Sequence, residues 1–222
     1  MDWWVVLEIF IGAGLAVGFV ILVENLRKPK LVLTIDNPQD HSYPAHANKP
    51  AETVRTLRLI VENRDLPRLA KWMSRNTASR CYGFITFYHL NDGQEVFGRS
   101  MPIKWSKLPG VQRFPDGRLE AYTFDSVKYI EIHAGYTEIL DVTARYDNDA
   151  ECYGWCYDNY FSNPLWRNPD WKLNSGRYLV KVEVICAGGH CVDLFRLIND
   201  VPVNAFRLEN AQPDDDKKVK KP

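Results

Sequence analysis

Residues 176–197 read Gly-Arg-Tyr-Leu-Val-Lys-Val-Glu-Val-Ile-Cys-Ala-Gly-Gly-His-Cys-Val-Asp-Leu-Phe-Arg-Leu. From Tyr178 to Cys186, every second side chain is apolar or aromatic, which is the period of a β-strand with one buried face. Gly188-Gly189 then gives a turn signal before a second run, His190 to Leu197. This stretch therefore predicts a β-hairpin near the end of a β domain.

The chain before this hairpin shows the same strand pattern in shorter segments. Turn residues such as Asn91-Asp92-Gly93 separate the segments. Roughly seven to nine short strands without alternating helices predict a mainly β fold, an antiparallel β-sandwich of immunoglobulin-like type. No sequence motif identifies a family. The expected strands before the hairpin are Lys30–Asp36, Leu57–Val61, Cys81–Leu90, Glu95–Arg99, Val127–Ile132, Glu138–Tyr146 and Glu151–Trp155.

The N-terminal segment Trp3–Val23 is apolar throughout except for Glu8. About 20 such residues cross a bilayer as a helix, which satisfies its own backbone hydrogen bonds. We therefore expect one transmembrane helix. A cleaved signal peptide is the alternative, but a basic region before the apolar run is missing, and Glu24–Arg27 is a poor cleavage site.

Charges beside the helix predict its orientation. Only Met1-Asp2 precedes it, whereas Arg27, Lys28 and Lys30 follow it. Basic residues stay preferentially on the cytoplasmic side, so we expect the C-terminal domain in the cytoplasm of a cell-membrane protein. The chain has 5 cysteines, and an odd number fits a reducing compartment. The opposite orientation stays open, because the short flanks offer few charges to count.

Small residues within the helix suggest a pairing face. Gly14 and Gly18 form a Gly-xxx-Gly motif, which lets two helix backbones approach closely. A homodimer through this face and a plain monomeric anchor are the two alternatives. Glu8 lies on a second stripe of small residues, with Gly12 and Ala16.

The sequence divides into three parts. Residues 1–29 form the anchor and its basic flank, residues 30–208 form a single β-sandwich domain, and residues 209–222 form a tail. The tail ends in Asp-Asp-Asp-Lys-Lys-Val-Lys-Lys-Pro, and its segregated charges predict a disordered terminus.

Composition and motifs argue against nucleic-acid binding and catalysis. Lys+Arg and Asp+Glu both number 28, so no overall basic field would attract a nucleic acid. The sequence lacks a phosphate-binding glycine loop, a nucleophile elbow and a His-Glu-x-x-His pattern. We therefore expect a non-catalytic protein without a cofactor.

One segment departs from the strand pattern. Between Leu66 and Arg75, apolar residues recur with the period of a helix, and basic residues occupy another side. We expect a short amphipathic helix in a crossover, with its apolar side packed on the sandwich. In the alternative, the basic side lies with Trp72 on anionic lipid headgroups. The membrane-surface residues are then Arg68, Lys71 and Arg75.

The cysteines allow three interpretations. Buried, reduced thiols that pack as small apolar groups are the first. A disulfide between Cys186 and Cys191 is the second, if the protein is exported. Tetrahedral zinc is the third, with the ligands Cys152, Cys156, Cys186 and Cys191.

The connection from Tyr153 to Trp171 concentrates aromatic residues among polar neighbours. Such residues dominate binding surfaces, but the same connection would also suit folding back on the sandwich with its tryptophans buried. Both interpretations stay open. The binding residues under the first are Trp155, Tyr157, Tyr160, Trp166, Arg167 and Trp171.

These observations predict a single-pass membrane protein whose β-sandwich binds a protein partner. It would act as a sensor, adaptor or scaffold at the inner face of the membrane. An exported, membrane-tethered module that binds a glycan or a surface protein is the alternative.

Overall fold

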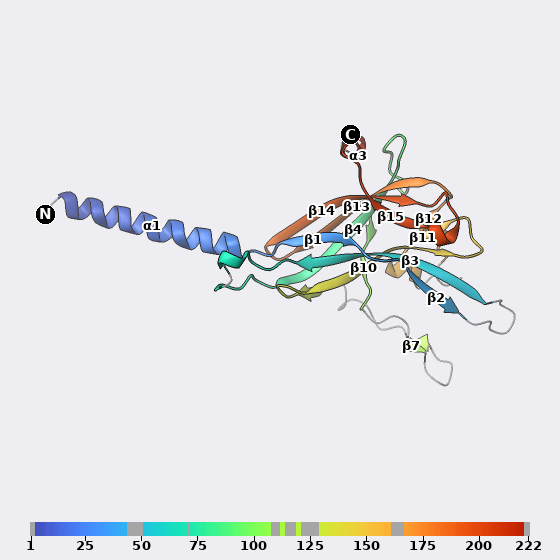
Figure 1. Ribbon diagram of the computed structural model, residues 1–222, viewed down its shortest axis with the longest axis horizontal. Coiled ribbons are helices and arrows are strands. Elements are labelled where there is room, and N and C mark those ends of the chain that lie inside the picture. Colours follow the sequence, from blue (N-terminus) through green and yellow to red (C-terminus); the bar gives the residue numbers. More distant parts are fainter. Residues whose placement is uncertain are drawn as a thin grey trace.

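The computed structural model describes residues 3–43, 51–70, 72–107, 112–113, 119–120, 129–160 and 167–219. A long N-terminal helix, α1 (Trp3–Arg27), extends away from a domain built on two antiparallel β-sheets (Figure 1). The chain passes from α1 to the first strand, β1 (Leu31–Ile35), through only three residues. The helix and the domain therefore follow each other without a long linker.

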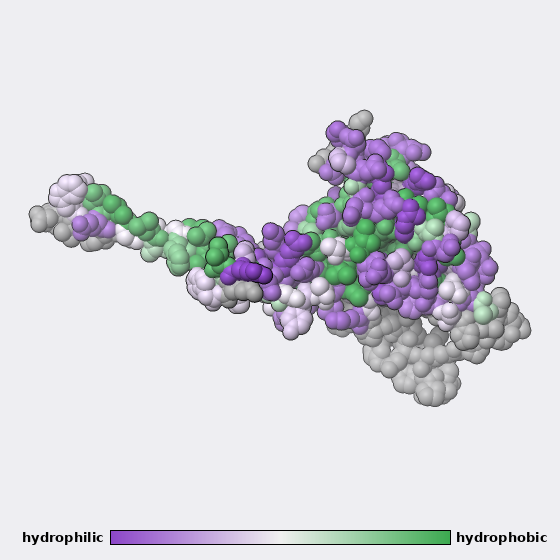
Figure 2. All heavy atoms as spheres, in the orientation of Figure 1, coloured by the Kyte–Doolittle hydropathy of each residue, from purple (hydrophilic) through white to green (hydrophobic). Residues whose placement is uncertain are grey.

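The surface of α1 is apolar and uncovered, as Figure 2 shows. Phe10 and Leu15 are each 71% exposed. The segment Phe10–Arg27 is long and apolar enough to cross a membrane, and none of it is buried in the domain. The helix expected over Trp3–Val23 is thus present and continues to Arg27, close to Pro29, which cannot extend a helix.

The larger sheet has seven strands among the described residues. Its order is β1-β3-β10-β11-β12, with β2 added beside β3 and β6 beside β10. Besides β1, its strands are β2 (Gln39–Tyr43), β3 (Glu52–Asn63), β6 (Lys104–Trp105), β10 (Thr137–Tyr146), β11 (Cys152–Gly154) and β12 (Lys172–Leu173).

The second sheet has six strands in the same described part. Its order is β15-β14-β13-β4-β5, and β9 also pairs with β4. Its strands are β4 (Ala78–His89), β5 (Met101–Pro102), β9 (Ile130–Ile132), β13 (Arg177–Cys186), β14 (Gly189–Ile198) and β15 (Arg207–Asn210). A small ribbon pairs β7 (Gln112–Arg113) with β8 (Leu119–Glu120).

The other helical segments among the described residues are short and lie between or after strands. They are η1 (Arg68–Ala70), α2 (Tyr157–Tyr160), η3 (Pro169–Trp171), η4 (Val203–Ala205) and α3 (Asp215–Val219).

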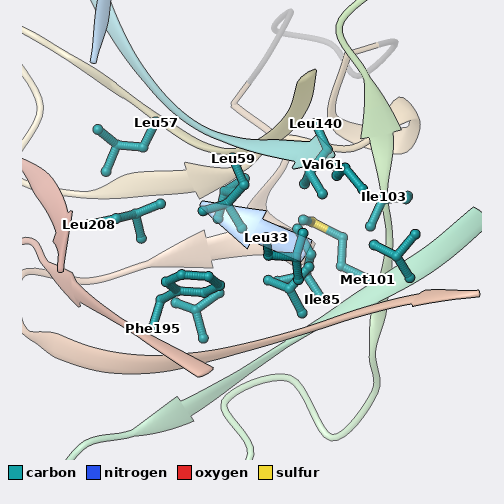
Figure 3. Packing of buried hydrophobic residues seen from close by; sticks show 14 of the residues in the cluster. Leu33, Leu57, Leu59, Val61, Ile85, Met101, Ile103, Leu140, Phe195 and Leu208 are labelled. Atoms are coloured by element: carbon teal, nitrogen blue, oxygen red, sulfur yellow. The ribbon is translucent and has the colours of Figure 1, made fainter. Parts of the chain in front are cut away.

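The two sheets enclose a continuous apolar core. Leu57, Leu59 and Val61 of β3 face Ile85 of β4 and Phe195 of β14 (Figure 3). All five side chains are at most 3% exposed. The alternation of apolar residues along β3 therefore faces the other sheet, as in a sandwich.

The hairpin predicted from residues 176–197 is confirmed. β13 pairs with β14 in continuous antiparallel register from Arg177↔Ile198 to Cys186↔Gly189. Gly188 adopts φ +81°, a left-handed conformation that glycine allows at the turn. The strand expected at Glu95–Arg99 is reduced to one isolated bridge, Tyr88↔Glu95.

The C-terminal tail is more ordered than its charges predict. Glu209 and Asn210 belong to β15, and residues 215–219 form α3. Arg196 of β14 binds the carboxylate of Asp215 through two hydrogen bonds, 2.6 Å from Nε and 2.8 Å from Nη2. For the described residues 209–219 the expectation of disorder is therefore wrong, because a bidentate ion pair fixes a segment without an apolar pattern.

A buried amide connects the helix exit to the sandwich. Asn63, fully buried at the end of β3, accepts a hydrogen bond from the backbone N–H of Lys30 at 3.1 Å. Its Nδ2 donates to the backbone carbonyls of Asn76 and Ile132, each at 3.0 Å. One side chain thus joins three segments at the end of the domain next to α1.

We expect Asn63→Ala to destabilise the domain strongly. The change would leave three backbone groups without the partner shown here, at about 1–3 kcal/mol for each group that water cannot reach. In chemical unfolding of the full chain in detergent, the free energy of unfolding should fall by about 3 kcal/mol. Asn210→Ala, at an exposed site, is the matched control. Equal effects of the two variants would contradict the junction role.

We expect the attachment of α3 to depend on pH. Hydrogen bonding to Arg196 lowers the pKa of Asp215 from 3.8 to about 2. The carboxylate therefore stabilises the fold above pH 4, by about 2 kcal/mol, and this contribution disappears as the pH falls from about 4 to 2.

Asp215→Asn should lower the free energy of unfolding at pH 7. Below pH 4, the free energies of unfolding of the variant and of the unmodified chain should become more similar. Asp214→Asn, where the side chain is 81% exposed, is the control. A difference for Asp215→Asn that does not change with pH would refute the ionic contribution.

Candidate functional site

The aromatic connection 153–171 supplies core residues as well as surface. Trp155 is 6% exposed and Trp171 is 1% exposed, so the expectation that these two indoles form a binding surface is wrong. The alternative, folding back on the sandwich, describes both. The side chain of Tyr160 and all of Trp166 lie outside the described residues.

A buried amide holds this connection against the domain. Asn159 is fully buried, and its Nδ2 donates to the carbonyl of Gly154 at 2.6 Å. Its Oδ1 accepts from the backbone N–H of Asn168 at 2.8 Å. These bonds close a loop of the connection and bring Trp171 back onto the core, where its ring meets Phe97 edge to face.

Arg167 contributes to this packing through its charge. Its guanidinium binds Glu52 at 2.8 Å and Asp149 at 2.9 Å. It also lies over the ring of Tyr146, 3.7 Å from the centroid. Because these contacts already engage the cation, the structure gives Arg167 a role in fixing the connection to β3 and β10.

A cleft opens beside the outer face of β4, and aromatic rings make up much of its wall. Its volume is about 360 Å³. The connection 153–171 reaches it through α2. The lining residues are Tyr82, Gly83, Phe84, Pro102, Ile103, Tyr129, Tyr157 and Asp158.

Three rings on one side of this cleft are arranged edge to face. The centroid of Tyr82 lies 6.2 Å from that of Phe84 and 5.6 Å from that of Tyr129. Phe84 is 38% exposed and Tyr129 is 44% exposed. The guanidinium carbon of Arg80 lies 5.3 Å from the Tyr129 centroid. The rings therefore support one another, and Phe84 and Tyr129 remain partly exposed to solvent.

Local sequence explains the shape of β4 at the cleft. A Cβ added at Gly83 would lie 1.9 Å from the carbonyl oxygen of Glu183 on β13, so only glycine fits this close approach. On its other edge, Gly83 accepts a hydrogen bond from the N–H of Ile103 at 3.0 Å. Pro102, the residue before Ile103, lies in the edge strand β5, where its missing N–H is tolerated.

Tyr157 is the expected binding residue that lines this cleft. Its side chain is half-buried, and burial, with the nearby charge of Asp141, raises the pKa of its phenol. The hydroxyl is therefore protonated at neutral pH. With the carboxylate of Asp158 beside it, the cleft combines stacking surfaces with few polar groups, an arrangement that binds flat or apolar ligand groups.

The local sequence signal is the presence of large side chains on both sides of the strand Cys81–Leu90, and this pattern alone predicts that both faces of β4 are covered. Thr86 and Tyr88, on the outer face, are indeed 7% and 8% exposed. Phe84 on the same face is open, because what covers each position depends on distant connections. Tyr129 and Asp158 come from two such connections.

The basic segment does not form the expected amphipathic helix. Only η1, three residues long and without a buried residue, is helical among the described residues from 66 to 75. Leu69, expected to pack on the sandwich, is 96% exposed. Arg68 is exposed, Arg75 donates to the backbone carbonyl of Lys28, and Lys71 lies outside the described residues.

Two of the candidate zinc ligands, Cys152 and Cys156, are fully buried thiols, whereas Cys191 is partly exposed. Burial raises the pKa of Cys152 to about 12 and that of Cys156 to about 11, so both are protonated at neutral pH. Within the described ranges, no three His, Cys, Asp or Glu side chains come together in a way that would hold a metal ion.

The predicted disulfide between Cys186 and Cys191 does not fit the geometry of the hairpin. In the β13–β14 register, Cys186 faces Gly189 and Cys191 faces Val184, a diagonal spacing of about 7–8 Å that exceeds disulfide reach. All five cysteines are free.

Cys81 and Cys186 lie one step beyond the pair Tyr82↔Ile185 of β4 and β13. The carbonyl of Gly83 points away from β13, toward Ile103, so Cys81 shares this direction and forms a non-hydrogen-bonded pair with Cys186. Such pairs have Cα atoms about 4.5 Å apart, within disulfide reach. Both cysteines are at most 8% exposed.

Comparison with known proteins gives no match, since no family model, no curated protein and no solved structure aligns significantly with this chain.

Proposed function

We propose that this protein is a single-pass, membrane-anchored and non-catalytic binding module. Its β-sandwich would act as a sensor, adaptor or scaffold at the inner face of the cell membrane, and the aromatic cleft would receive a protein partner. The observation that carries this proposal is the cleft itself, where the rings of Phe84 and Tyr129 remain partly exposed on a domain attached to an exposed apolar helix. Aromatic rings are the side chains that most often dominate binding energy at interfaces.

The distance of the cleft from the helix constrains the partner. Asn76 donates a hydrogen bond to the carbonyl of Arg27, the last residue of α1, at 2.7 Å. Phe84 follows Asn76 by only a few residues, so even a fully extended chain places it within roughly 27 Å of that contact. If α1 spans the membrane, a partner must bind close to the bilayer surface.

Two finer features belong to the same proposal. An immunoglobulin-like arrangement is supported by the two facing antiparallel sheets. Pairing of two anchors is supported by the open surface at Gly14 and Gly18, where an added Cβ meets no atom within 4 Å.

An exported module that binds a glycan or a surface protein is the second candidate. The pair Cys81 and Cys186 favours it, because a non-hydrogen-bonded cross-strand pair is suited to a disulfide in an oxidising compartment. The aromatic rings of the cleft would also suit stacking on a sugar.

Photo-crosslinking tests the cleft. A photoreactive phenylalanine derivative at Phe84, in the full chain in native membranes, should give a discrete adduct with one protein. Val192 on β14 is 41% exposed outside the cleft lining, and it is the matched control position. Tyr129→Ala should remove the adduct formed at Phe84 and leave the thermal midpoint nearly unchanged. The absence of an adduct, or the same adducts at both positions, would argue against a protein-binding cleft.

The location of the C-terminus and the state of the thiols separate the two candidates. If the module is cytoplasmic, a green fluorescent protein fused to the C-terminus should be fluorescent. Alkaline phosphatase fused at the same place should be inactive. All 5 cysteines should then be alkylated after rapid denaturation. For an exported module, the reporter result should be reversed. Two fewer cysteines should then be alkylated, because a disulfide between Cys81 and Cys186 protects them. In Cys81→Ser this disulfide cannot form, so Cys186 should be alkylated. That outcome would replace the leading proposal by its alternative.

A further inference from the structure

The end of the sandwich next to α1 binds backbone carbonyls of the last helical residue and of the short segment that follows it. The backbone N–H of Asn76 binds the carbonyl of Arg27 at 2.7 Å, and the Arg75 guanidinium binds that of Lys28. Arg64 donates its N–H to the carbonyl of Lys30 at 3.0 Å. Helix-end carbonyls need such partners, and here the segment 64–76 supplies them. This segment therefore lies beside the point where the helix ends, as Figure 1 shows.

Large apolar side chains project from this same end. Leu69 is 96% exposed and Trp72 is 73% exposed. Their loop is held by its own turns, with Ala70 N–H bonded to Pro67 O at 2.8 Å and Met73 N–H to Ala70 O at 3.0 Å. Leu69 and Trp72 are thus exposed on a loop whose backbone is held by hydrogen bonds.

A second loop brings another exposed ring to this end. Tyr136 is 68% exposed, and its backbone carbonyl accepts from Asn63 N–H at 3.2 Å. The neighbouring Gly135 donates its N–H to the Asn63 carbonyl at 2.7 Å. The loop of Tyr136 is therefore fixed beside the junction that receives the helix.

Charged groups surround these apolar side chains. The acidic residues of the segments that meet here are Glu24, Glu62, Asp65, Glu131 and Glu138, and Glu138 is paired with Lys107. The basic residues outnumber them and are Arg27, Lys28, Lys30, Arg64, Arg68 and Arg75. Exposed Trp and Leu beside Lys and Arg match the bilayer interface, which offers partial burial for rings and phosphates for cations.

We propose that Leu69 and Trp72, together with Tyr136, insert into the interfacial layer of the bilayer that α1 crosses, on the side where α1 ends. The surrounding arginines and lysines contact lipid phosphates. This inference rests on the proposed function, because it requires α1 to span the membrane. Insertion at two loops besides the helix holds the sandwich in one orientation and so fixes the direction in which the aromatic cleft opens.

Fluorine NMR of the full chain tests this contact. The protein is labelled with 5-fluorotryptophan and placed in nanodiscs of phosphatidylcholine and phosphatidylserine, and the Trp72 resonance is assigned by its loss in Trp72→Phe. A nitroxide on the lipid near the headgroup should relax this resonance several-fold more than a water-soluble gadolinium chelate does. The result that overturns the inference is the reverse order, which would place Trp72 in water.

The chain contains its own reference tryptophans. Trp3 and Trp4, 75% and 73% exposed on α1, should respond to the lipid nitroxide. The buried Trp155 and Trp171 should respond to neither agent. If Trp3 and Trp4 respond and Trp72 does not, the anchor stands and the inference about the loop fails. If Trp72 responds to neither agent, protein covers it and the inference also fails. If Trp3 and Trp4 do not respond, both proposals fail.

Discussion

The buried side chain of Asn63 is the constraint on which the junction of helix and sandwich depends. An amide in an apolar interior is costly unless its donors and acceptor are satisfied, and here each is bonded to a different segment. The partners are Lys30 just before β1, Asn76 just before β4 and Ile132 at the end of β9. The amide therefore connects both sheets to the exit of α1. The amide of Asn63 therefore couples the domain to the exit of the helix, together with the backbone hydrogen bonds from Asn76 to Arg27 and from Arg64 to Lys30.

Other buried polar groups fix the outer layers of the sandwich in the same way. Lys104 and Asp141 form an ion pair at 2.7 Å with both side chains 7% exposed, and Ser106 donates to the same carboxylate. Arg145 binds the side chain of Asn199 at 3.1 Å and the carbonyl of Val201 at 2.7 Å. Buried ion pairs add little net stability, but leaving one partner alone is expensive, so they penalise other arrangements of the connections.

The aromatic cleft results from several of these connections meeting at β4. Gly83 brings β4 close to β13, Ile103 lies where the chain passes from one sheet to the other, and α2 adds Tyr157. The cleft adjoins the core, because Ile103, one of its lining residues, is 5% exposed and belongs to the core cluster. It lies on a domain attached to an apolar helix by only three residues, so any ligand that it binds is held near whatever that helix enters.

The sequence by itself determined the elements whose signal is local. The period of two along residues 176–197 predicts the hairpin, and a continuous apolar run predicts α1. Each pattern shows within its own segment which side chains will be removed from water. The tertiary structure alone decided the environment of Trp155, Trp171, Phe84 and Asp215. These residues lie in connections or on outer faces, where exposure depends on which distant segment packs against them. Asp215 is ordered because Arg196 faces it, and Phe84 is open because the chain around it covers only part of β4. No local pattern records such pairings, since their energy arises only when segments far apart in sequence come together.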